Sequence, residues 1–303
     1  MIEDLAKNTA RRKQTDALFA VIGLLATFVG MITLAALMID LAIDGVDRIS
    51  YGFFTSFPSR FAGRAGILSA WVGTTAVMLV TAATAVPLGV AAGVYLEEYA
   101  PRNWWTTIIE INIANLAGVP SIIYGLMALG LFVYQLGLGQ SILTAGLTLA
   151  LLILPIVIVA TREAIRAIPN SIREAAYALG ATKWRTIRDH VLPYSTGGIL
   201  TGVIIALSRA IGETAPLITI GALTFIAFLP DSPITSEFPF ISFKWLMSPF
   251  TVMPIQMFNW VSRPQQEFHL NAAATGLILM IMTLCMNAVA IYFRYRFRKR
   301  IKW

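Results

Sequence analysis

The chain has few charged residues and almost no cysteine, and both shortages limit what it can be. Only 13% of its 303 residues are charged and 57% are apolar, whereas about 25% of the residues in an average soluble domain are charged. The single cysteine, Cys285, excludes an intramolecular disulfide and a thiolate metal cluster. The chain also lacks a Gly-x-x-x-x-Gly-Lys-Ser/Thr motif, so it does not hold nucleotide phosphates in a P-loop. This composition is typical of a membrane protein.

The apolar residues are gathered into six runs that are long enough to cross a membrane. A helix needs about 20 apolar residues to span a hydrocarbon core about 30 Å thick. We therefore predict an all-α, polytopic membrane protein with six transmembrane helices, at 17–39, 69–94, 112–134, 141–160, 196–228 and 270–293. The fifth run is overlong and contains Pro216, so it is either one kinked helix or a full span followed by a short re-entrant piece.

The cationic residues are distributed unevenly between the loops. Seventeen fall in the N-terminal leader, the 95–106 loop, the 161–194 loop and the C-terminal tail, and only five fall in the opposite loops. The positive-inside rule then places both termini and the 161–194 loop in the cytoplasm. Basic loops beside a membrane also explain the net charge of +7 without nucleic-acid binding.

No linker or repeat divides the chain, which indicates one transmembrane domain at 17–293 between a cytoplasmic leader at 1–16 and a basic tail at 294–303. The outer loop at 230–268 is rich in proline, and its Trp245 and Trp260 suit the headgroup region. Two pairs of glycines one turn apart, Gly89 with Gly93 and Gly198 with Gly202, allow close contact between helices.

The 161–194 loop has the pattern of two short helices joined by a turn. Ser171 can cap the first helix with Glu174 completing a capping box, and Gly180 can end it in a left-handed conformation. A second helix can begin at Thr182 and stop at Pro193. Its buried face would hold Trp184, Ile187 and Val191.

The first helix of this loop carries small residues where a partner could approach. Ala175, Ala176 and Gly180 leave its outer face with little side-chain bulk, so another protein could come close to the backbone. The physics alone supports two interpretations equally, a docking surface or an amphipathic hairpin that holds the spans apart.

A resemblance separates these two interpretations. Glu174-Ala175-Ala176, then Gly180, then Pro193 after a hydrophobic residue, resembles the EAA loop of ABC importer membrane subunits. In that family the loop is the coupling helix, which sits in a cleft of an ATPase subunit. The resemblance implies a type I importer permease with no cofactor of its own, whose ATP and magnesium are bound by separate ATPase subunits.

Two charged residues lie inside the fifth run. Arg209 and Glu213 are four residues apart and hence on one face of a helix. A charge at that depth is expensive, so it faces protein or water and is a functional hypothesis by default. The planar fork of arginine suits phosphate oxygens, and Glu213 could hold Arg209 in place or accept a proton. The alternative is a purely structural ion pair between packed helices.

The third run is expected to be weak near Pro120. The proline and the two glycines of the Gly118–Gly125 stretch disfavour a regular helix at membrane depth, where Ser121 or freed backbone groups could line a pathway. Loose packing is the alternative explanation.

Two segments resemble the PstA family of phosphate-importer membrane subunits, Ser208–Leu217, which includes Thr214, and Asn115–Leu126. The resemblance implies that Arg209 takes part in phosphate translocation across a bacterial inner membrane. It also implies a second PstC-like permease subunit, two PstB-like ATPase subunits and an external PstS-like phosphate-binding protein.

Other interpretations remain open from the residues alone. A lone arginine also suits another small oxyanion, such as molybdate or sulfate. An ATPase-independent channel or secondary transporter would not need the hairpin. An intramembrane enzyme is disfavoured, because the spans contain no Ser/His, paired-Asp or His-Glu-x-x-His constellation.

Overall fold

A computed structural model describes residues 2–234, 240 and 242–298, and these residues form helices and loops without a β-strand. Among the described residues, five helices are long and apolar enough to cross a membrane, and a bent pair of helices supplies a sixth candidate span. The all-helical, six-span prediction is therefore confirmed, although one span is broken. Part of the predicted tail, 299–303, lies outside the described residues. The main helices are α1 (Ile2–Gly45), α3 (Leu68–Val94), α4 (Trp104–Leu116), α5 (Ser121–Ala128), α6 (Ile142–Arg166), α9 (Leu192–Ile211) and α12 (Gln266–Arg298).

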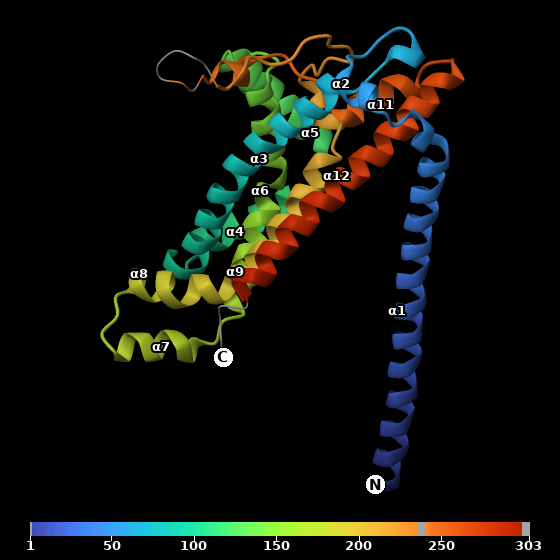
Figure 1. Ribbon diagram of the computed structural model, residues 1–303. Coiled ribbons are helices and arrows are strands. Elements are labelled where there is room, and N and C mark those ends of the chain that lie inside the picture. Colours follow the sequence, from blue (N-terminus) through green and yellow to red (C-terminus); the bar gives the residue numbers. More distant parts are fainter. Residues whose placement is uncertain (1, 235–239, 241, 299–303) are drawn as a thin grey trace.

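Helix α6 is the centre of the bundle, with α3 on one side and α9 on the other (Figure 1). The predicted glycine pairs make both contacts possible. A Cβ at Gly89 of α3 would come within 2.6 Å of Val157 in α6, and a Cβ at Gly198 of α9 would come within 2.6 Å of Ala164 in α6. Because glycine has no side chain there, the backbones approach closely and the apolar side chains around them interlock.

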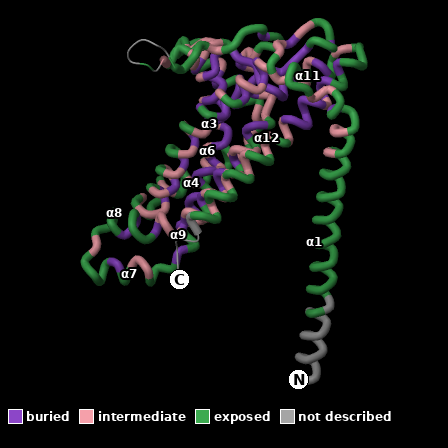
Figure 2. Tube along the Cα trace, viewed as in Figure 1, coloured by how far each residue is buried: buried purple, intermediate pink, exposed green. Residues whose placement is uncertain are grey.

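Helix α1 stands apart from the bundle for most of its length (Figure 1). No residue of its most apolar window is buried within this chain, as the long green stretch of the helix in Figure 2 shows. The helix joins the bundle only near its end, where the backbone of Gly45 lies against Ala274 of α12. The predicted leader at 1–16 has no break from the first span, since α1 begins at Ile2.

The third predicted span is two helices with a sharp bend between them. Helices α4 and α5 meet at 105° across a short break that contains Gly118 and Pro120. Proline cannot donate the next helical hydrogen bond, and the residue before it avoids helical geometry, which explains the break. A π-helical segment, η4 (Leu129–Gln135), continues α5. The expected weakness near Pro120 is confirmed.

The fifth run is also interrupted, so the first of its two predicted forms, a single kinked helix through residue 228, is wrong. Helix α9 ends at Ile211, and a five-residue helix, α10 (Ala215–Thr219), follows after a short break. Helix α10 packs on α5 at Gly125, where a Cβ would come within 2.7 Å of the Pro216 backbone. The two interrupted segments therefore lie against each other.

The loops around α2 (Tyr51–Thr55) and α11 (Met253–Val261) form a second apolar core at one end of the molecule. Trp260 is fully buried there, with its ring 6.1 Å from that of Phe53 and 6.5 Å from that of Phe268. The expectation that Trp260 sits at a lipid interface is wrong, because the folded loop supplies apolar neighbours that the local sequence does not reveal. Trp245 is partly buried.

The opposite end carries the loop between α6 and α9, which folds into α7 (Asn170–Ala178) and α8 (Lys183–Thr186). We call this pair the hairpin, and this end of the molecule the hairpin end. The start of α1 and the last turns of α12 lie toward the same end (Figure 1). The grouping of the termini with the hairpin follows the charge pattern of the sequence.

Candidate functional site

The first helix of the hairpin begins earlier than predicted and is capped differently. Helix α7 starts at Asn170 with Pro169 at its N-cap position, and no side chain caps it. The predicted Ser171 cap with a Glu174 capping box is therefore wrong, because the extended backbone at Pro169 starts the helix two residues sooner. Gly180 has a φ of +79°, as the predicted left-handed end of the helix requires.

The second helix follows the prediction at its start and not at its end. The Thr182 side chain accepts a hydrogen bond from the Arg185 backbone, and Ile187 and Val191 are fully buried. Trp184, however, is exposed. Pro193 does not stop the helix, which runs without interruption from Lys183 to Ile211.

A π-helical segment, η5 (Ile187–Val191), immediately precedes α9 and explains how the helix passes the proline. Pro193 follows this segment directly, as the second residue of α9, and a π-helical turn is one of the local changes that accompany an irregularity inside a helix.

Only part of the outer face of α7 is made of small side chains. Glu174 and Ala175 are exposed, but Ala176 is buried against the rest of the hairpin, so the prediction of a small outer face fails at that position. Leu179 is almost fully exposed and Tyr177 is partly exposed beside it. An acidic side chain next to an apolar pair, at a turn that protrudes from the bundle (Figure 1), is a surface that another protein can bind.

Ion pairs tie the hairpin to the bundle, and the sequence reasoning missed them. The Arg173 guanidinium of α7 donates two hydrogen bonds to Glu98 Oε1, at 2.7 and 3.0 Å. Glu97, the residue before Glu98, points toward α6 and pairs with Arg162 and Arg166 there. Both acids lie in η3 (Tyr95–Tyr99), a π-helical segment that extends α3.

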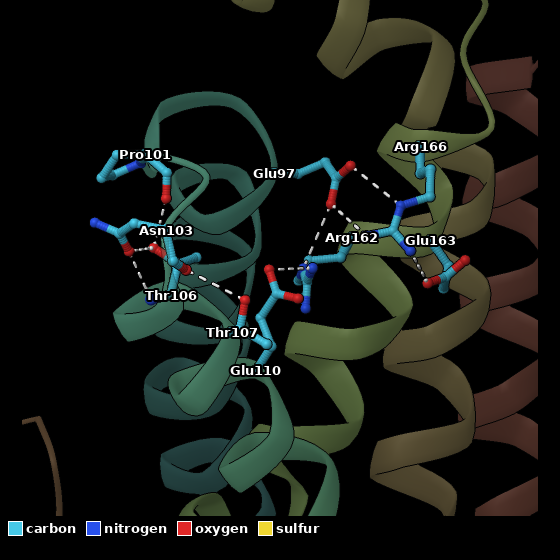
Figure 3. A network of polar contacts seen from close by, with 9 residues as sticks. All are labelled: Glu97, Pro101, Asn103, Thr106, Thr107, Glu110, Arg162, Glu163 and Arg166. Carbon is cyan, nitrogen blue, oxygen red and sulfur yellow. Dashed lines mark hydrogen bonds and ion pairs between the residues drawn. The ribbon is translucent and has the colours of Figure 1, made fainter.

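A second group of ion pairs joins η3, α6 and α4 (Figure 3). Arg162 Nη2 lies 2.6 Å from Glu110, and its Nε lies 3.4 Å from Glu97 without the alignment of a hydrogen bond. Arg166 donates to Glu97 and to Glu163. Arg162 and Arg166, one turn apart at the end of a predicted span, were the sequence feature that could have indicated these ion pairs. Their partners Glu97 and Glu110 are far away in the sequence, so the pairing itself could not be predicted. We call these ion pairs, together with Arg173 and Glu98, the arginine network.

Arg209 and Glu213 lie where α9 ends, near the packed pair of short helices. Arg209 is in the last turn of α9, and Glu213 lies beyond it in the break before α10. Glu213 is therefore not in the same helix as Arg209, although their four-residue spacing predicted that it would be. The two side chains still form an ion pair, with Arg209 Nε 3.4 Å from Glu213 Oε1. The Arg209 side chain remains 41% exposed within this chain.

The other two predicted pathway residues lie on the short helices. Thr214 is the N-cap position of α10 and Ser121 is the first residue of α5, and both are partly buried. Among the described contacts, none joins Ser121 to Arg209 or Glu213. The structure therefore brings Arg209, Glu213 and Thr214 together at one break and places Ser121 on a neighbouring element.

A bundle of membrane-length helices, with a protruding hairpin between two of them and charges at a broken span, has the form of a transport protein. The chain belongs to the family "binding-protein-dependent transport system inner membrane component", whose model matches residues 85–303. A solved structure of the MetNI methionine ABC transporter in an inward-facing conformation is similar in fold. Its TM-score is 0.57 at 16% identity, and the match covers 74% of this chain and 93% of that chain.

Curated relatives cover nearly the whole chain. The phosphate transport system permease protein PstA of Yersinia pestis is 31% identical, over 99% of this chain and 96% of that protein. PstA of Mycobacterium leprae is 33% identical over 86% of this chain and 80% of that protein. The probable ABC transporter permease protein YqgI of Bacillus subtilis is 31% identical over 91% of this chain and 95% of that protein.

Proposed function

We propose that this chain is one of two membrane subunits of an ABC importer that carries inorganic phosphate into the bacterial cytoplasm. The transport subunit performs no covalent chemistry itself, and separate ATPase subunits bind ATP with magnesium. Relatives named as phosphate transport permeases over almost the full length support the substrate. The residues from 17 to 293 act as one permease unit in this proposal.

The observation that carries the proposal is the state of Arg209. It is a cation in the last turn of a helix that is long and apolar enough to cross a membrane, it keeps 41% of its side chain exposed, and it has one long ion-pair contact. A charged group left open in lipid is costly, so this face is covered by a second permease subunit or by a water-filled pathway. A guanidinium with free N–H groups binds the oxygens of a phosphate ion in two parallel hydrogen bonds. Glu213 keeps Arg209 in position between substrates.

The hairpin is the proposed attachment point of the ATPase subunits. Glu174 and Ala175 are exposed, and Gly180 makes the tight turn that presents Leu179. The surplus of cations near this end supports its location in the cytoplasm, with both termini on the same side. The remaining partner is an external phosphate-binding protein, which would approach the opposite end.

Uptake of labelled phosphate by membrane vesicles that contain the complete importer tests both assignments. We expect Arg209→Gln to reduce uptake by about 100-fold, as expected for the loss of a strong charge-assisted contact, while the complex still assembles. Competition with unlabelled sulfate and molybdate decides between phosphate and another oxyanion.

We expect Glu174→Arg to reduce the amount of ATPase subunit that copurifies with the complex. The matched control is Glu163→Arg, a similarly exposed acid at the end of α6. Normal uptake in Arg209→Gln together with normal ATPase attachment in Glu174→Arg would contradict the proposal.

A further inference from the structure

Arg173 joins three elements at the hairpin end. Besides its two hydrogen bonds to Glu98, it donates to the carbonyl oxygens of Ile165 at 3.1 Å and Ile168 at 2.8 Å. The Ile165 carbonyl lies in the last turn of α6, where it also accepts from the Ile168 backbone N–H, and Ile168 lies two residues beyond the helix. One side chain of α7 therefore binds the end of α6 and holds η3 at the same time.

The Arg173–Glu98 ion pair is shielded from water, unlike an ordinary ion pair on a protein surface. The Arg173 side chain is 15% exposed and the Glu98 side chain is 7% exposed. Exposed pairs bend and exchange partners at little cost, whereas a buried charge that loses its partner is left without solvation. Elements joined in this way move together, because separation would strand both charges.

The arginine network continues from η3 to α4, the first half of the broken span. Arg162 contacts Glu97 beside Glu98, and it also contacts Glu110 on α4 (Figure 3). Helix α4 has no buried residue within this chain, so few other contacts fix its position. A cleft of about 510 Å³ between η3, α4 and the end of α6 leaves space beside the helix. Through its bend, α4 leads to α5, which packs on α10 beside the Arg209 break.

We propose that Arg173 is a positioning residue for transport: it fixes α7 to η3 so that movement of the docked hairpin is transmitted to α3 and α4. This inference rests on the proposed function, because it requires an ATPase subunit bound to the hairpin. It assigns Arg173 and Glu98 to coupling rather than to ATPase binding or phosphate binding.

The measurement is the number of phosphate ions taken up per ATP hydrolysed, in proteoliposomes containing the complete importer. We expect Arg173→Gln to retain the ATPase subunit and its hydrolysis but to lower this ratio about tenfold, within the usual range of coupling between sites. The charge exchange R173E/E98R restores the pair and is expected to recover most of the ratio. Arg188→Gln is the matched control, because Arg188 lies in η5 directly after the hairpin and pairs with its neighbour Asp189; its ratio should equal that of the wild type.

The outcomes separate the inference from the proposed function. A wild-type complex that carries no phosphate would overturn the proposed function and the inference with it. A wild-type complex that transports, while Arg173→Gln keeps a normal ratio, would overturn the inference alone, as would a charge exchange that restores nothing. If Arg173→Gln does not assemble, Arg173→Lys keeps the charge but loses the forked contacts; a lowered ratio supports the inference and a normal ratio overturns it.

Discussion

Two arginines in this chain are held in opposite ways. Arg173, at the hairpin end, uses all three of its guanidinium nitrogens in hydrogen bonds and is 15% exposed. Arg209, at the end of α9, has one contact of 3.4 Å and is 41% exposed. A saturated, buried arginine has no capacity left for a ligand, whereas a loosely paired one does. This difference supports the two proposals made above, that the arginine network transmits position and that Arg209 binds the substrate.

The largest effect on folding is expected from Arg162→Gln, which would remove the least exposed arginine of the arginine network. Its side chain is 10% exposed, and its loss would leave Glu110 without its cation and Glu97 with Arg166 alone. We expect the free energy of unfolding to fall by about 3 kcal/mol, the usual cost of removing one member of a buried pair. Denaturant titration of the purified subunit in mixed micelles measures this change.

Arg166→Gln is the control for that experiment, because Arg166 lies one turn further along α6 and is 53% exposed. Its removal should cost less than about 1 kcal/mol, as expected for an exposed pair. Equal losses in the two variants would contradict the view that burial distinguishes members of the arginine network.

An intermediate effect is expected from Gly125→Ala, at the contact between α5 and α10. The added methyl group would collide with Thr219 Oγ1 and with the backbone of Pro216, so the two short helices must separate. We expect a loss of about 1–3 kcal/mol in the free energy of unfolding, the usual cost of overpacking. We also expect slower phosphate uptake, because the Arg209 break lies beside this contact.

Gly130→Ala is the matched control on the same broken span. A Cβ at Gly130 meets no atom within 4 Å, so both stability and uptake should remain close to those of the wild type. If Gly125→Ala proved as stable and as active as Gly130→Ala, the close packing of α5 on α10 would contribute neither to stability nor to uptake.

The smallest effect on folding is expected from Arg209→Gln, although its effect on uptake is large. Because the contact is long and the Arg209 side chain is 41% exposed, the free energy of unfolding should change by less than about 1 kcal/mol. The same micelle titration measures it alongside the uptake assay. A loss comparable to that of Arg162→Gln would identify Arg209 and Glu213 as a structural pair and remove the basis of the comparison.

Local and periodic features were predictable from the sequence. The length of each apolar run follows from the thickness of the bilayer, and the turn at Gly180 follows from the backbone freedom of glycine. Small residues one turn apart also predicted where α3 and α9 would approach another helix, although the sequence did not identify α6 as that helix. Each of these depends on a few neighbouring residues, which is why the sequence determined it.

Only the tertiary structure decided which distant groups meet. Arg173 and Glu98 are 75 residues apart, and no local pattern links them. The 105° bend between α4 and α5 and the burial of Trp260 likewise depend on elements elsewhere in the chain. The sequence by itself determined that the chain spans a membrane, that it has a hairpin and that Arg209 lies within a predicted span. These features follow from the apolar solvent of the bilayer and from the geometry of neighbouring residues. The fold decided that one arginine is enclosed and another is open, because enclosure requires partners brought together by packing.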